Sequence, residues 1–217
     1  MQLTALGGAA EVGASCMLLQ VAGKNILFDA GIRVNRTGEA ALPDLGKLSF
    51  LAGKLDLVLV SHAHTDHIGA LPLILSRYPT VPILSTYPTK QISAILLRDA
   101  IKIMNREAGV PLYNEEMVER LLWGMRCVKE SVWHKIDDEL EVYFHPCGHV
   151  LGASSILLKT SEGNVVYSGD ISTANQRTVD GMTEIDFFQP DALILESTYG
   201  NELHPSRRIE EKDLLFQ

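Results

Sequence analysis

Eight short segments of the 217-residue chain contain apolar residues that either alternate with polar ones or run together, and Gly, Asn or Asp bounds most of them. Side chains along an extended strand face alternate sides, so these segments predict strands. They lie near residues 2–6, 14–21, 25–29, 56–60, 140–145, 153–159, 164–168 and 192–196. Gly-Lys near 23–25 and Gly-Asn at 163–164 are typical of hairpin turns.

Apolar residues recur at helical spacing in three further segments. Pro72 can open a helix that ends near Ser76, because the first turn of a helix needs no N–H from a proline. Segments 88–108 and 114–125 each repeat four apolar residues, namely Ile92, Ile95, Leu96 and Ile103, and Met117, Val118, Leu121 and Leu122. Strand hairpins at both ends, with helices between and after them, predict an α/β (α+β) fold in which helices cover a two-sheet sandwich.

The composition predicts one well-packed domain without a membrane span. Hydrophobic residues make up 46% of the chain, yet no apolar run approaches the roughly 20 residues that cross a bilayer. The start, MQLTALGG, lacks the basic and long apolar parts of a signal peptide. Cys16, Cys127 and Cys147 are odd in number and far apart, which argues against a disulfide framework. We therefore expect a cytoplasmic protein that contacts no membrane.

The charge of the chain bears on nucleic-acid binding. The formal net charge is -8, so the surface as a whole repels nucleic acid unless positive charge gathers locally or metal ions supply it. Arg98, Lys102 and Arg106 recur every four residues and align on one face of the helix predicted over 88–108. This stripe has two interpretations, a solvated helix face or a contact with a phosphate backbone.

The segment VLVSHAHTDHIGALP, residues 58–72, places three histidines and an aspartate within six positions directly after a predicted strand. His62 and His64 leave the strand two positions apart and can point at one ion, while Asp66 and His67 can point at a second. Nitrogen and carboxylate donors at this spacing suit zinc. A lone histidine is more often a satisfied core residue, but four such residues where a loop begins favour a metal site.

Four more polar residues occupy places from which they can complete such a site. Asp29 ends ILFDAG, His149 lies in HPCGHVLGASS, Asp170 ends VVYSGD and Glu196 lies in ALILEST. A charged residue that closes an apolar strand is commonly just solvated. Four such residues together with HAHTDH predict that all of them converge at one edge of the fold.

With these motifs the chain resembles the metallo-β-lactamase-fold hydrolases, whose pattern of FDAG, HxHxDH, a later histidine and GD it matches in order and spacing. GHVLGA at 148–153 and ESTYG at 196–200 resemble the β-CASP branch, particularly the nuclease subunit of the cleavage and polyadenylation factor and its prokaryotic relatives. The resemblance implies a metallo-β-lactamase αββα sandwich, incomplete at the C-terminus. It also implies a zinc-dependent ribonuclease that cleaves RNA phosphodiester bonds.

The resemblance further implies a role for each matching residue. Six residues are implied zinc ligands: His62, His64 and His149 for a first ion, Asp66 and His67 for a second, and Asp170 as the bridge. Asp29 would accept a hydrogen bond that fixes the orientation of a ligand. Asp66 and Glu196 are the candidate catalytic residues, and Glu196 would orient a later histidine that protonates the leaving group.

Two zinc ions would supply the chemistry that phosphodiester hydrolysis needs. They would acidify a bridging water from a pKa of about 15.7 to near 7 or below, which gives hydroxide at neutral pH. They would also neutralise several of the carboxylates that make up the net charge, so the site can be positive within an acidic protein. Cys147, His134, His145 and His204 are predicted not to be ligands, since Asp170 already takes the bridging position.

Residues 1–200 are predicted to form the N-terminal portion of a metallo-β-lactamase-like domain, and 201–217 the truncated start of a β-CASP cap domain. In β-CASP enzymes a returning part of the chain carries the histidine that completes the second zinc site. We therefore expect a fragment of a longer protein rather than a reduced natural form. By itself it should bind the first zinc more tightly than the second and show weak or no nuclease activity.

Two alternative functions come from different classes. A thioesterase like glyoxalase II shares HxHxDH, but Glu196 in ESTYG and the implied cap disfavour it. A catalytically inactive binding partner is disfavoured because the motif positions keep metal-binding residue types. RNA is the expected substrate partner. The motifs do not decide whether the protein forms a homodimer or whether it cleaves RNA or DNA. They also leave open its RNA sequence preference and whether it acts as an endonuclease or an exonuclease.

Overall fold

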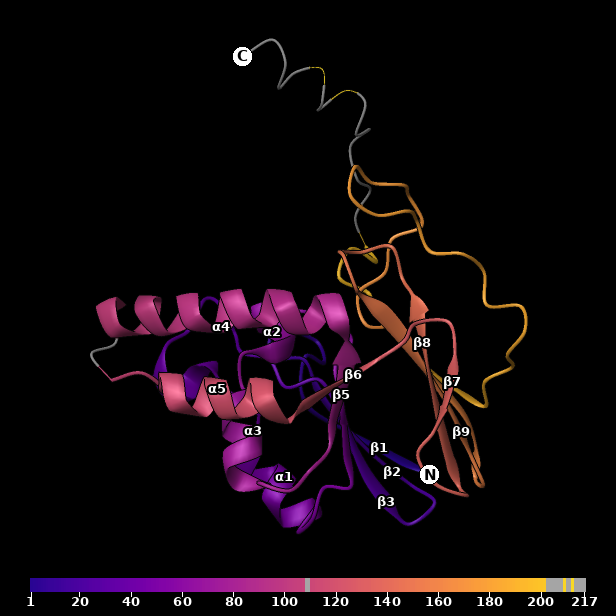
Figure 1. The fold of residues 1–217 in the computed structure, drawn as a ribbon, viewed down its shortest axis with the longest axis horizontal. Coiled ribbons are helices and arrows are strands. Elements are labelled where there is room, and N and C mark those ends of the chain that lie inside the picture. Colours follow the sequence, from indigo (N-terminus) through magenta and orange to yellow (C-terminus); the bar gives the residue numbers. More distant parts are fainter. Residues whose placement is uncertain (108–109, 202–208, 210–211, 213–217) are drawn as a thin grey trace.

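In a computed structural model, which describes residues 1–107, 110–201, 209 and 212, two β-sheets pack face to face (Figure 1). The first sheet has the strand order β1 to β6, and β3, β4, β5 and β6 run parallel to one another. Its strands are β1 (Gln2–Gly7), β2 (Cys16–Val21), β3 (Lys24–Phe28), β4 (Leu57–Leu59), β5 (Ile83–Thr86) and β6 (Met125–Val128). The antiparallel β2–β3 hairpin turns at Ala22 and Gly23, one residue before the predicted Gly-Lys turn, and the β9–β10 hairpin turns at 161–162, just before the predicted Gly-Asn turn.

The second sheet has the order β11-β10-β9-β8-β7 and is antiparallel except for the β10–β11 pair. Its strands are β7 (Trp133–Lys135), β8 (Leu140–Pro146), β9 (Ser154–Thr160), β10 (Gly163–Tyr167) and β11 (Ala192–Ile194). The interface between the two sheets follows the alternation of side chains along each strand. Ile156 and Leu158 of β9 pack inward against residues such as Phe28 of the first sheet, whereas Leu157 faces outward.

Helices cover the outer face of the first sheet (Figure 1). They are the 3-10 helix η1 (Gly38–Ala41) and the α-helices α1 (Leu45–Leu51), α2 (Thr65–Ile68), α3 (Leu71–Arg77), α4 (Tyr87–Glu107) and α5 (Glu115–Gly124). The outer face of the second sheet carries the non-helical segment 171–191, whose Phe188 packs with Leu157 and Val166. The predicted mixed α/β sandwich is confirmed, and its second helix layer is not found among the described residues.

The structure also contains elements that the hydrophobic pattern does not predict. Strand β5 has four residues, and strand β6 follows α5 directly, so its apolar residues read as a continuation of that helix. Strand β7 has three residues and α2 has four, both too short to show a period. Tertiary pairing, which supplies β5 and β6 with parallel partners, therefore decides these elements.

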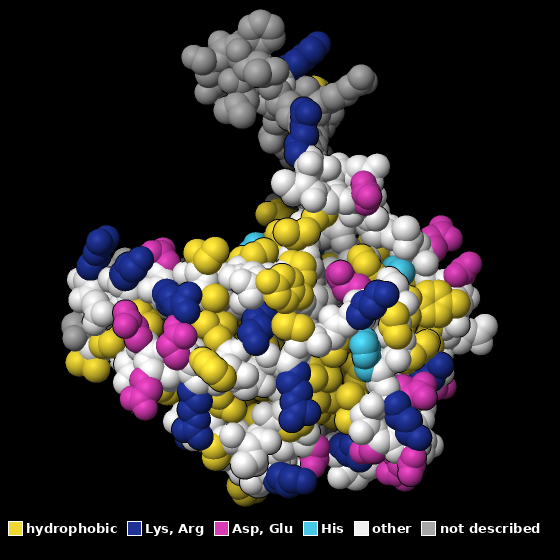
Figure 2. Space-filling model, viewed as in Figure 1, with side chains coloured by type: hydrophobic (Ala, Val, Ile, Leu, Met, Phe, Trp, Pro, Cys, Tyr) yellow, Lys and Arg dark blue, Asp and Glu magenta, His cyan; other side chains and the backbone are white. Residues whose placement is uncertain are grey.

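Two sequence-based expectations about the surface and the membrane can be compared with the structure. Arg98 contacts Glu119 of α5 at 2.6 Å, and Lys102 lies 3.8 Å from Asp99, so two of the three stripe cations are paired. On the face of the molecule that Figure 2 shows, Lys and Arg side chains are scattered among Asp and Glu side chains. These contacts favour the solvated-face interpretation. Within the described residues, no helix is both long and apolar enough to cross a membrane.

The predicted start of the cap domain lies mostly outside the described residues. Of residues 201–217, where the cap domain is predicted to start, only 201, 209 and 212 belong to the described part of the chain. His204, predicted not to be a ligand, lies outside it.

Candidate metal centre

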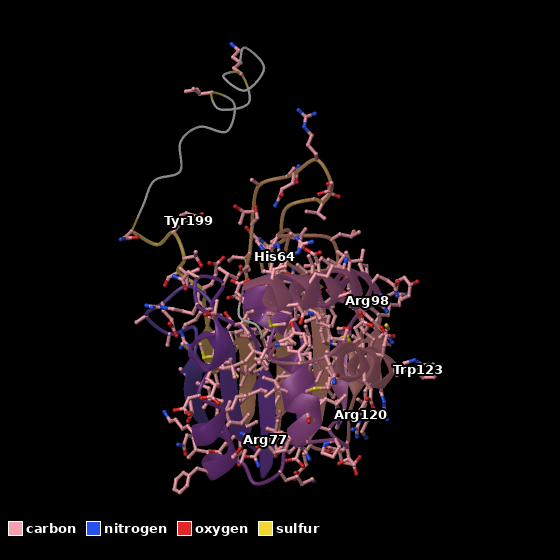
Figure 3. The ribbon with its side chains drawn as sticks, turned by 90° about the vertical axis from the view of Figure 1, so that its left-hand side faces the viewer. His64, Arg77, Arg98, Arg120, Trp123 and Tyr199 are labelled. Carbon is pink, nitrogen blue, oxygen red and sulfur yellow. The ribbon has the colours of Figure 1, made fainter. Side chains whose placement is uncertain are left out.

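The predicted site residues lie in loops at one edge of the sandwich, where several strands end. Asp29 follows β3, and His62 lies three residues beyond the parallel strand β4, so both leave the first sheet at the same edge. His149 follows β8 and Asp170 follows β10 of the second sheet. Figure 3 shows His64 at this end of the molecule, with Arg77 at the opposite end. Each sheet therefore contributes residues to one site.

Four side chains form the first site, defined here as His62, His64, His149 and Asp170. One potential ligand atom from each lies within 4.8 Å of the other three. Nδ1 of His64 is 3.1 Å from Nε2 of His62 and 3.0 Å from Nε2 of His149. Oδ2 of Asp170 lies 3.8 Å from Nε2 of His62 and 3.6 Å from Nε2 of His149. The structure thus brings together residues separated by more than one hundred positions.

The donor atoms of the first site fit a metal ion. Nitrogen ligands about 2.0–2.1 Å from a tetrahedral zinc lie roughly 3.3–3.4 Å from one another. The histidine pairs at 3.0 and 3.1 Å are close to that separation. Three imidazole nitrogens and one carboxylate oxygen are also ligand types that zinc prefers. The four residues can hold a metal ion, and their role as ligands stays a prediction.

Asp66 and His67, predicted to hold a second ion, lie beside Asp170, and these three residues are called the second site here. Nε2 of His67 lies 3.3 Å from Oδ1 of Asp170 and 3.9 Å from Oδ2 of Asp66. Asp170 therefore directs Oδ2 to the first site and Oδ1 to the second. This placement agrees with the bridging role that the sequence motif implies. The second site offers three protein groups and the first offers four.

Asp29 lies behind His67 and is fully buried. Its Oδ2 accepts hydrogen bonds from Nδ1 of His67 at 2.8 Å and from the Ser61 hydroxyl at 2.6 Å. Its Oδ1 accepts from the Ser61 backbone N–H at 2.7 Å. Because Asp29 occupies Nδ1, the Nε2 atom of His67 is left to face Asp66 and Asp170. This arrangement matches the orienting role implied for Asp29.

Two glycines allow the loops of the site to approach each other. A Cβ on Gly31 would overlap backbone atoms of Asp66 and His67. Gly148 has φ of +73°, a left-handed conformation that favours glycine, and a Cβ there would overlap the backbone oxygen of Ser172. These glycines bring the segment after β3 against α2 and the His149 loop against the segment after Asp170.

Burial and neighbouring charges shift the pKa values of the site residues. Burial, and then the positive charge of His67, hold the pKa of His62 well below its usual value. Burial also opposes charge on His67, but hydrogen bonds to Asp170 and Asp29 outweigh it and raise the pKa of His67 to about 10. Burial opposes ionisation of Asp170 as well, yet its bond to His67 lowers the pKa of Asp170. A cation that binds Nε2 of His67 would have to compete with a proton there.

Glu196 lies in the same cleft, a cavity of about 490 Å³ that Asp66, His67 and Asp170 also line. Its carboxylate accepts hydrogen bonds from the backbone N–H of Ile171 at 3.0 Å and of Thr198 at 3.2 Å. Glu196 thus holds the backbone immediately after Asp170. The histidine that it is predicted to orient is not among the described residues of the site.

The residues predicted not to be ligands have other contacts. Cys147 is buried and donates from Sγ to the backbone oxygen of Asp170 at 3.0 Å, and burial raises the pKa of its thiol to about 12. Nε2 of His145 donates to the backbone oxygen of Thr183, and Nε2 of His134 donates to that of Lys129. None of the three belongs to the first site.

Sequence reasoning missed three residues of the site. Ser61 gives Asp29 two hydrogen bonds, and Tyr167 donates to Asp29 from its hydroxyl. The Ser15 hydroxyl lies 3.3 Å from Nε2 of His67. Ser61 adjoins His62 in the motif, and Tyr167 precedes Ser-Gly-Asp, but a serine or tyrosine in an apolar strand gives no signal of its own.

Comparisons with known proteins agree with this geometry. Residues 9–93, which include the HAHTDH segment, match a family model described as the metallo-β-lactamase superfamily. Integrator complex subunit 11 of Danio rerio is 35% identical over 220 residues, which cover 99% of this chain and 37% of that protein. Cleavage and polyadenylation specificity factor 73 of Drosophila melanogaster is 35% identical, over 97% of this chain and 30% of that protein. The chain therefore spans about a third of the length of these relatives.

Solved structures support the fold. A protein of unknown function from Enterococcus faecalis V583 has a TM-score of 0.55 at 21% identity, over 79% of this chain and 43% of that one. A metallo-β-lactamase from Cronobacter sakazakii, a mutant in its HARLDQ motif, has a TM-score of 0.51 at 17% identity, over 80% of this chain and 66% of that one. At these identities the likeness concerns the fold alone.

Proposed function

We propose that this chain carries the metal site of a zinc-dependent ribonuclease of the β-CASP type, because residues 9–93 match the metallo-β-lactamase superfamily model and the chain is 35% identical to Integrator complex subunit 11 and to cleavage and polyadenylation specificity factor 73. One observation carries the proposal. His62, His64, His149 and Asp170 come from both sheets, and their donor atoms converge within 4.8 Å. The similarity to cleavage and polyadenylation specificity factors agrees with the resemblance seen in GHVLGA and ESTYG.

The residues of the chain would divide the work of holding two zinc ions. His62, His64 and His149 hold the first ion, Asp66 and His67 hold the second, and Asp170 serves both through its two oxygens. When bound, two zinc ions lower the pKa of water from about 15.7 toward 7 and stabilise negative charge on a phosphodiester. Asp29 fixes the ring of His67, and Glu196 fixes the backbone after Asp170.

RNA is the proposed substrate class. The names of two relatives refer to cleavage and polyadenylation, which concerns RNA. The net charge of -8 does not prevent this, because several of the carboxylates it counts lie at the metal site, where cations would neutralise them. The basic stripe on α4 is largely paired with carboxylates, so the metal site itself is the proposed attraction for a phosphodiester.

The test replaces His64, whose Nδ1 lies between the other two histidines of the first site. We expect His64→Ala in the full-length protein to lose the first zinc ion and to cut labelled RNA at least about 100-fold more slowly, since even residues behind the ligands cost 10–100-fold. His134→Ala is the matched control, because His134 bonds a backbone oxygen away from the site. Zinc analysis and RNA cleavage are measured on the same samples.

The outcomes separate this proposal from its alternatives. RNA cleavage that survives His64→Ala would contradict it. Hydrolysis of a glutathione thioester without action on RNA would favour a thioesterase. Wild-type protein that is purified from zinc-containing medium and binds no metal would favour an inactive binding partner.

A further inference from the structure

Tyr167 is a buried residue of β10 whose hydroxyl reaches across to the first sheet. It donates to Oδ2 of Asp29 at 2.8 Å, the same oxygen that accepts from Nδ1 of His67. Its ring stacks on Phe28, the residue before Asp29, with centroids 4.7 Å apart. Burial, and then the charge of Asp29, raise the pKa of Tyr167 far above its usual value, so the hydroxyl stays a donor. The hydroxyl therefore bonds the carboxylate that sets the orientation of His67.

The other partners of Asp29 do not replace this bond. Asp29 follows β3 of the first sheet, and Ser61 and His67 follow β4 of the same sheet. Tyr167 belongs to the second sheet and lies three residues before Asp170. The Tyr167–Asp29 bond thus fixes the end of β10, and with it Asp170, relative to the carboxylate behind His67. Asp29 also has φ of +54°, which is uncommon for a residue with a Cβ and needs support from its surroundings.

We propose that Tyr167 is a positioning residue for the second site, which it serves by holding Asp29 so that Nε2 of His67 faces Oδ1 of Asp170. The inference rests on the proposed metal-binding function. The first site depends on Asp29 less directly. Within the described hydrogen bonds its histidines do not contact the Asp29 carboxylate, and His62 is linked to it only through the Ser61 hydroxyl, which lies 3.0 Å from Nδ1 of His62. Loss of the Tyr167 hydroxyl should therefore weaken binding of the second ion more than binding of the first.

The test is a zinc titration of Tyr167→Phe in the full-length protein against a competing chelator. Phenylalanine keeps the ring on Phe28 and removes only the hydroxyl. We expect the dissociation constant of the second zinc to rise about 10–100-fold, as for other residues that orient a ligand. The first dissociation constant should change less than about 3-fold.

Tyr143→Phe is the matched control. Tyr143 lies on β8 of the same sheet, where its ring contacts Trp133 and Phe187 on the outer face. Within the described contacts its hydroxyl makes no hydrogen bond to a site residue, so both zinc constants should match those of the wild type. Thermal unfolding of the metal-free variants measures any general loss of stability.

The ratio of the two constants decides the inference. An unchanged ratio in Tyr167→Phe overturns it, whether both constants stay at wild-type values or both weaken together. Equal weakening together with a lower melting temperature would show that the hydroxyl only stabilises the fold. Wild-type protein that binds no zinc would overturn the proposed function, and the inference with it. Wild-type protein that binds two ions while Tyr167→Phe does so equally well would overturn the inference alone.

Discussion

Gly31, in the segment that follows β3, packs against the backbone of Asp66 and His67. Its N–H donates to the Ser15 backbone oxygen at 3.0 Å, and the Ala30 N–H donates to the His67 oxygen at 2.8 Å. The segment that contains Gly31 and the segment that contains Asp66 and His67 therefore lie too close together for a side chain at Gly31. At the scale of single residues, the position of the second site depends on a missing Cβ as much as on the ligands.

Gly31→Ala should therefore destabilise the chain and impair the second site. The added methyl meets backbone rather than a flexible side chain, so we expect a loss of about 3 kcal/mol or more in the free energy of unfolding. Gly53→Ala is the control, because a Cβ there meets no atom within 4 Å. Urea unfolding and zinc titration of both variants measure the effect. Equal stability of the two variants would mean that the segments can separate without cost.

Among the secondary-structure elements, the start of β4 is fixed to the β2–β3 hairpin by one carboxylate. Oδ2 of Asp56 accepts from the Asn25 N–H at 3.0 Å, and Oδ1 contacts Lys54 at 2.7 Å. The Asp56 N–H donates to the Asn25 oxygen at 2.9 Å. Burial opposes ionisation of Asp56, but the bonds from Asn25 and Lys54 outweigh it and lower its pKa. The ionised carboxylate thus supports the parallel pairing of β3 and β4.

Asp56→Asn should lower stability in a pH-dependent manner. A lowered folded-state pKa means that Asp56 adds stability at neutral pH, and that this contribution is lost as the pH falls through the folded-state value, below the usual 3.8. We expect a loss of about 1 kcal/mol at pH 7 that shrinks toward pH 3. Urea unfolding at both pH values, with Asp138→Asn as the exposed control, tests this. A difference that persists undiminished in acid would assign the effect to packing.

The whole molecule brings the site together because each sheet supplies part of it. His62 and His64 follow the first sheet, whereas His149 and Asp170 follow the second. An ion held by all four would link the two sheets at their shared edge, in addition to the apolar interface between them. A ligand that binds only the folded chain stabilises it by mass action.

Zinc should therefore raise the melting temperature of the chain, and a chelator should reverse the rise. At free zinc about 100-fold above the dissociation constant, the gain is about 2.7 kcal/mol. For a chain of this size that corresponds to about 5–10 °C. His149→Ala should lose most of this rise and His134→Ala should keep it. A rise of the same size in His149→Ala would show that the second sheet takes no part in holding the ion.

Sequence alone determined most of the strands and the helices α3, α4 and α5, and it predicted the residues of the candidate site. Local chemistry suffices for these, because the period of apolar residues reflects which face is buried, and HAHTDH concentrates metal-binding groups within six positions. The motifs FDAG, GHVLGA and ESTYG predicted the partners of HAHTDH through the family they resemble. The superfamily match, over residues 9–93, includes FDAG and HAHTDH.

Only the tertiary structure decided which elements pair and which neighbours the site residues have. Strands β5 and β6 are too short to be predicted from their own residues and exist through parallel pairing with distant segments. The sequence allows two interpretations of the stripe that contains Arg98 and Lys102. The packing of α4 on α5 places Glu119 beside Arg98, which favours a solvated helix face. Ser61 and Tyr167 gave no signal in the sequence, because a hydroxyl acquires its role only from the buried carboxylate that it meets across the fold.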